Sequence, residues 1–167
     1  CTDQRELFAD GFTPLNGALR DALRYFSVSG WTAQDNSVTY PTPLSSNDVS
    51  GAGINGGSAC RSAAVILVTD GDETCDTQSE AVAAAQLLYQ NGVTVGGKTF
   101  KIPVSVVNFA GGSAANTDAI AAAGGTGSSI LANSETELSI ALSGIIAARV
   151  RPETCDNADN DCNGCAD

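Results

Sequence analysis

Apolar side chains recur at helical spacing near the start of the chain, over residues 14–26. Residues three and four positions apart share one face of a helix, so this spacing predicts an amphipathic helix. The expected buried stripe is Leu15, Ala18, Leu19, Ala22, Leu23 and Phe26. Thr13 followed by Pro14 is a favourable N-cap and first-turn pair, which predicts that the helix begins here.

Residues 29–62 lack this periodicity and are rich in Gly, Ser, Asn and Pro. A structureless loop of this length is unusual inside a compact domain. We therefore expect an insertion with some hairpin character around residues 38–40, which provides contacts through Trp31 and Tyr40. The alternative is a loop that is merely mobile.

Two short runs, residues 63–69 and 102–109, are apolar and rich in β-branched residues. Such runs are typical of strands buried on both faces of a parallel sheet. Thr77 and Glu80 form a capping box, which predicts a helix between the two strands. This helix is expected to run to residue 89 and to stop at Asn91-Gly92.

The same alternation continues toward the C-terminus, with a helix over residues 117–123 and a short strand over residues 128–131. A second capping box, Ser134 with Glu137, starts a helix that reaches about residue 149. Strands that alternate with helices predict right-handed βαβ units, and so a doubly wound, Rossmann-like α/β fold over residues 1–150. From residue 151 to residue 167 the composition changes to Cys, Asp and Asn, which predicts a separate disulfide-rich tail.

The charge excludes several classes of function. The chain has 19 acidic and 8 basic residues, a formal net charge of −11 and no histidine. No basic patch is available to neutralise phosphates, which argues against a nucleic-acid partner. Without histidine there is no Ser-His-Asp triad and no ordinary His-type zinc site. An acidic chain of this kind favours divalent cations bound by oxygen ligands.

Six cysteines are many for a cytosolic chain of 167 residues, and they favour disulfides in an oxidising, extracellular compartment. Six cysteines allow fifteen pairings. Cys155 with Cys162 is the first expected pair because both lie in one short motif. The alternative is a zinc site of four cysteines that includes the C-x-x-C of Cys162 and Cys165.

The first residue is Cys1 rather than Met, which indicates a processed, excised or partly observed product. A bacterial lipoprotein also begins with cysteine after processing and is the alternative. Neither a signal peptide nor an apolar run long enough to span a bilayer is expected.

A hydroxyl and a carboxylate are expected to meet at one edge of the sheet. Ligands of open α/β sheets bind at the carboxyl ends of the strands, and Asp70 directly follows the strand over residues 63–69. Thr13 begins a helix whose N-terminus faces the same edge if the helix packs on the sheet. Taken singly, Thr13 is only an N-cap and Asp70-Gly71 only a turn. Together they suit a hard cation such as Mg²⁺ or Ca²⁺.

Two segments, GFTPLNGALRDAL at residues 11–23 and VILVTDGDE at residues 65–73, resemble the von Willebrand factor A family. With the order of strands and helices, the resemblance covers most of residues 11–149. It implies a metal-ion-dependent adhesion site (MIDAS) for Mg²⁺ or Ca²⁺, with Thr13 as its loop threonine and Asp70 as its later aspartate. It also implies a non-enzymatic binding module, in which a carboxylate of a protein ligand completes the coordination of the metal.

The D-x-S-x-S loop of that family, which supplies its other metal-binding side chains, occurs nowhere in the chain. The family's sheet order is 3-2-1-4-5-6, which puts the missing first strand beside residues 65–69. A bare apolar edge would invite aggregation. We therefore expect the N-terminal half of the domain to exist upstream or as another chain.

Two alternative functions stay open. The domain could be a structural building block of a cell-surface appendage, with its metal edge unused. Residues 65–74 also fit the hhhh-D-x-D-x-T pattern of haloacid-dehalogenase-type phosphatases, with Asp70 as nucleophile and Asp72 as general acid. That pattern belongs on the first strand of its fold, whereas a helix precedes it here. Otherwise Asp72 and Glu73 are expected to be solvated loop acids.

The tail places oxygen-bearing residues at alternate positions. It fits the D-x-[DN]-x-[DN]-G start of a calcium loop, in which the glycine permits the sharp turn. The expected Ca²⁺ ligands are Asp159, Asp161, Asn163, the carbonyl of Cys165 and Asp167. The stretch ETCDNADNDCNG resembles short Cys/Asp metal-binding repeats of secreted bacterial surface proteins. A solvated acidic linker pinned by disulfides is the alternative.

Overall fold

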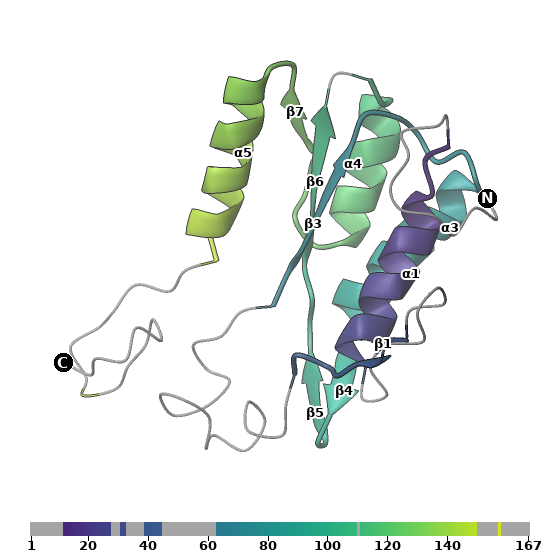
Figure 1. Ribbon diagram of the computed structural model, residues 1–167, viewed down its shortest axis with the longest axis vertical. Helices are drawn as coiled ribbons and strands as arrows, with labels where there is room; N and C mark the ends of the chain where they lie inside the picture. Colours follow the sequence, from purple (N-terminus) through teal and green to yellow (C-terminus); the bar gives the residue numbers. More distant parts are fainter. Residues whose placement is uncertain are drawn as a thin grey trace.

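The computed structural model describes residues 12–27, 31–32, 39–44, 63–109, 111–149 and 157. Within these residues the fold is mixed α/β, with a parallel three-stranded sheet that has helices on both faces (Figure 1). The sheet order is β3 (Val65–Thr69), β6 (Val104–Phe109) and β7 (Ile130–Ala132). The predicted alternation of parallel strands with helices is therefore confirmed for this part of the chain.

Helix α1 spans Leu15–Phe26, as the apolar spacing predicts. Leu15, Leu19 and Phe26 are buried and Ala22 and Leu23 pack against the same core, whereas Ala18 is exposed. The start of the helix differs from the prediction. Pro14 holds the N-cap position and no side chain caps the helix from there, so Thr13 is not its N-cap.

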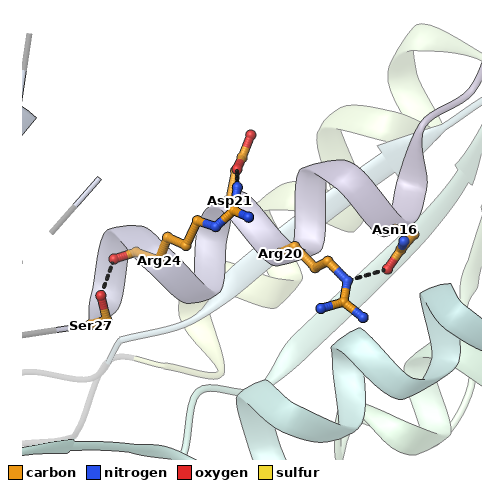
Figure 2. Close-up of polar contacts among 5 residues, drawn as sticks. All are labelled: Asn16, Arg20, Asp21, Arg24 and Ser27. Carbon is orange, nitrogen blue, oxygen red and sulfur yellow. Dashed lines mark hydrogen bonds and ion pairs between the residues drawn. The ribbon is translucent and has the colours of Figure 1, made fainter. Parts of the chain in front are cut away.

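Polar contacts join side chains along α1 (Figure 2). Arg20 Nε donates to Asn16 Oδ1 at 3.1 Å, and Arg24 pairs with Asp21 at 2.9 Å. Ser27 closes the helix, since its hydroxyl donates to the Arg24 carbonyl at 2.6 Å. The exposed Arg24–Asp21 ion pair contributes little to stability, about 0–1 kcal/mol.

The alternation of side chains along the strands divides the core in two. One face of the sheet carries Leu67, Val104 and Val106, and it is covered by α1, α3 (Gln78–Gln86) and α4 (Ala114–Ala123). The opposite face carries Val107 and is covered by α5 (Glu135–Ala147) (Figure 1).

Strand β3 departs from the predicted burial on both faces. Ile66 is 36% exposed and Val68 is 46% exposed. Both side chains lie on the α5 face, because the parallel register pairs Ile66 with Ser105 and Val68 with Val107. Helix α5 packs on β6 and β7, which leaves this part of β3 uncovered by the described helices. β3 is also the outer strand of the sheet, and none of the described strands pairs with its far edge.

The predicted capping box of α3 is present: the Thr77 hydroxyl accepts from the Glu80 N–H, and the Glu80 carboxylate accepts from the Thr77 N–H. The helix continues as a π-helical segment, η1 (Leu87–Asn91), and ends at Gly92. A hairpin that the apolar pattern does not predict follows, formed by β4 (Val93–Val95) and β5 (Lys98–Phe100). Its turn is the glycine pair at 96 and 97, with φ of 58° and 81°, which matches a two-residue hairpin turn.

The later elements lie close to their predicted places. Helix α4 begins earlier than expected, with Ser113 at its N-cap position, and it ends at Gly124 as predicted. The hydroxyl of Ser134 caps α5 by accepting from the Glu137 N–H at 3.2 Å. None of the helices in the described ranges combines the length and apolarity that crossing a membrane requires.

Part of the long glycine-rich region forms the expected hairpin. Strand β1 (Trp31–Thr32) pairs antiparallel with β2 (Thr39–Tyr40), with Trp31 opposite Tyr40. The predicted calcium ligands at positions 159–167 and the predicted Cys155–Cys162 pair lie outside the residues that the structure describes.

Asp118 is expected to make the fold sensitive to acid. Its Oδ1 accepts from the Ser129 hydroxyl at 2.7 Å and from the Ser129 N–H at 2.8 Å, and these bonds lower the pKa of the Asp118 carboxyl below its ordinary value of about 3.9. A lowered folded-state pKa contributes stability above the unfolded value, and this stability is lost as the pH falls through the folded pKa. Thermal unfolding followed below pH 4 should therefore show a shallower acid decline for Asp118→Asn than for wild type. Identical declines would contradict this assignment.

Candidate functional site

Thr13 lies against the loop that follows β3. Its N–H donates to Thr74 Oγ1 at 2.6 Å, and its carbonyl accepts from the Thr74 N–H at 3.1 Å. A Cβ added to Gly71 would stand 3.1 Å from Thr13 Oγ1. The hydroxyl of Thr13 therefore lies beside the residue that follows Asp70, at the carboxyl edge of the sheet.

Asp70 stands at the start of a tight turn. The Thr69 hydroxyl donates to the Gly71 carbonyl at 2.7 Å and accepts from the Gly71 N–H at 3.2 Å, which fixes the backbone on either side of Asp70. The Asp70 side chain is exposed. None of the described residues donates a hydrogen bond to its carboxylate, so this carboxylate can accept a cation or a donor from solution.

The loop after β6 also contacts Asp70. A Cβ added to Gly111 would stand 1.8 Å from the Asp70 carbonyl oxygen, so the two backbones are in close contact. Asn108, which is 2% exposed, holds this loop: its Nδ2 donates to the Gly112 carbonyl at 2.7 Å and its Oδ1 accepts from the Gly112 N–H at 3.0 Å. Sequence reasoning missed this support, for which the available signal was an Asn near the end of a predicted strand, three residues before a Gly-Gly pair.

The prediction that Asp72 and Glu73 are solvated loop acids is wrong. Asp72 Oδ1 accepts from the Ser113 N–H at 2.8 Å, which ties the loop after β3 to the N-terminus of α4. Glu73 accepts three backbone hydrogen bonds, from Asn16, Cys75 and Asp76. Both residues are only partly exposed, and their carboxylates join segments that are distant in the sequence.

Three segments therefore meet at the candidate site: the start of α1, the loop after β3 and the loop after β6. The first provides the Thr13 hydroxyl and the second the Asp70 carboxylate, two oxygen donors of the kind that Mg²⁺ and Ca²⁺ prefer. No group of three or more Cys, Asp or Glu side chains within the described ranges is arranged to hold a metal. The two donors thus form at most part of a coordination sphere.

Cys75 lies in the same loop and is disulfide-bonded. The other five cysteines of the chain are at positions that the structure does not describe. The disulfide pins the loop after β3 covalently, a few residues beyond Asp70.

Comparisons of the chain with protein-family models, with curated proteins and with solved structures give no match.

Proposed function

We propose that the chain carries the C-terminal part of a von Willebrand factor A-type, Rossmann-like domain and is an extracellular, metal-dependent adhesion or protein-binding module, not an enzyme. One observation carries the proposal. The Thr13 hydroxyl lies against Gly71, beside the exposed Asp70, at the carboxyl edge of a parallel sheet. Thr13 and Asp70 would hold Mg²⁺ or Ca²⁺, and a carboxylate of a protein ligand would complete the coordination.

The proposal includes a partner for β3. The far edge of this strand has no neighbour among the described strands, and Ile66 and Val68 are exposed on one face. We propose that the N-terminal half of the domain, upstream or as a separate chain, pairs with this edge and covers these side chains. That half would also supply the D-x-S-x-S loop. An apolar edge of this kind otherwise recruits other chains.

Two further features support an extracellular binding module. The disulfide at Cys75 is typical of oxidising compartments. The Asp72 carboxylate accepts the Ser113 N–H, so one of its oxygens has a structural role, which favours a binding module over the phosphatase alternative. From the sequence alone, we also propose that Asp159, Asp161, Asn163, Cys165 and Asp167 bind a separate Ca²⁺ ion.

The cation site can be tested with Mn²⁺, which broadens the NMR signals of nearby amides even when binding is weak. We expect the amides of Thr13 and Gly71 to broaden first. Asp70→Asn should raise the Mn²⁺ concentration required by about tenfold, since it removes the charged ligand. Thr13→Val should weaken binding as well, and Thr13→Ser should not, because serine keeps the hydroxyl.

Asp21→Asn is the matched control, because it removes the same charge from the outer face of α1. The metal-dependent function is refuted if the Thr13 and Gly71 amides of Asp70→Asn broaden at the same Mn²⁺ concentration as those of wild type and of Asp21→Asn. A structural building block of a surface assembly would then be the better interpretation.

A further inference from the structure

The N-terminus of α1 has no cap of its own. Pro14 holds the N-cap position without a side-chain acceptor, and the first turn has no acidic residue. The first N–H groups of a helix and the positive end of its dipole need a partner. Glu73 is that partner: its Oε2 accepts from the Asn16 N–H at 2.5 Å, across 57 residues of sequence.

The same carboxylate also stabilises the conformation of its own loop. Glu73 Oε1 accepts from the Cys75 N–H at 2.7 Å and from the Asp76 N–H at 3.1 Å. One partly buried side chain therefore joins the segment that carries Thr13 to the loop that carries Asp70. A second contact lies beside it, in which Asn16 Nδ2 donates to Asp76 Oδ2 at 2.8 Å.

We propose that Glu73 is a positioning residue of the cation site, which acts with the Thr13–Thr74 hydrogen bonds to set the separation of the Thr13 hydroxyl from the Asp70 carboxylate. This inference rests on the proposed function. Both oxygens of Glu73 accept backbone N–H groups, so the side chain acts on the geometry of the two donors and does not coordinate the cation. Glutamine cannot replace it, because an amide has one acceptor oxygen and would turn its NH₂ toward a backbone donor.

The chain offers a matched control for Glu73→Gln. Glu80 accepts from the Thr77 N–H at 3.0 Å at the N-terminus of α3, so Glu80→Gln removes the same charge from a helix N-terminus, while its amide oxygen keeps this single acceptor contact. It does not touch the Thr13 segment. We expect Glu73→Gln to lower the Mn²⁺ affinity at Gly71 by about tenfold, with Glu80→Gln close to wild type.

The outcomes separate the two proposals. If the wild-type chain shows no Mn²⁺ effect at Thr13 and Gly71, the proposed function falls and the positioning role with it. If wild type binds and the two glutamine variants have equal affinity, only the positioning role is overturned. If Glu73→Gln fails to fold, a Mg²⁺ titration of the wild-type chain tests the positioning role of Glu73 instead. The Asn16 amide signal should shift together with that of Gly71, and a shift at Gly71 alone would overturn the role of Glu73.

Discussion

Gly111→Ala is expected to destabilise the protein by about 3 kcal/mol and to displace Asp70. The added methyl group would stand 1.8 Å from the Asp70 carbonyl oxygen and 2.8 Å from its carbonyl carbon, which no side-chain adjustment can relieve. Either the loop after β6 or the turn at Asp70 has to move. Urea unfolding measures the loss of stability, and the amide shifts of Asp70 and Gly71 report the displacement.

The control for this substitution is Gly144→Ala. Gly144 lies in α5, and an added Cβ would meet nothing within 4 Å. Alanine favours a helix over glycine by about 1 kcal/mol, so this variant should be as stable as wild type or slightly more stable. Surface substitutions ordinarily change the free energy of unfolding by no more than about 0.5 kcal/mol. If Gly111→Ala changes it by no more than this, the close contact with Asp70 is wrong.

Leu19→Ala is expected to lower the free energy of unfolding by about 2–5 kcal/mol, because it removes a fully buried side chain of α1. This is a large fraction of the roughly 5–15 kcal/mol that stabilises a typical domain. The loss would also loosen the helix that carries the Thr13 segment, so cation binding at Gly71 should weaken with it.

Leu23 allows a comparison within the same helix. It is only partly buried against the same core, so Leu23→Ala should cost less, about 1–2 kcal/mol. Both free energies can be obtained from urea unfolding at one pH. If Leu19→Ala lowers the free energy of unfolding by no more than Leu23→Ala does, the placement of α1 on the sheet is contradicted.

Some contacts of the candidate site could not be predicted from the sequence. The partners of Glu73 and Asp72 are Asn16 and Ser113, which lie 57 and 41 residues away. A carboxylate in a loop looks the same in the sequence whether it is solvated or capped by a distant backbone. The prediction of solvated acids failed for this reason.

The hairpin of β4 and β5 is a different kind of omission. Its turn, the glycine pair at 96 and 97, was visible in the sequence. The strands were missed because three-residue strands give too short a pattern of alternation to be recognised.

The periodicity of apolar residues and the caps at Thr77 and Ser134 determined the helices and parallel strands, because these signals act between residues a few positions apart. The chain order of strand and helix also put Asp70 at the carboxyl edge. Only the tertiary structure decided that the Thr13 hydroxyl lies against Gly71, that Glu73 caps α1, and that Ile66 and Val68 stay exposed. Each of these depends on which distant segment packs against which, and burial is a property of the packed assembly and not of the residue.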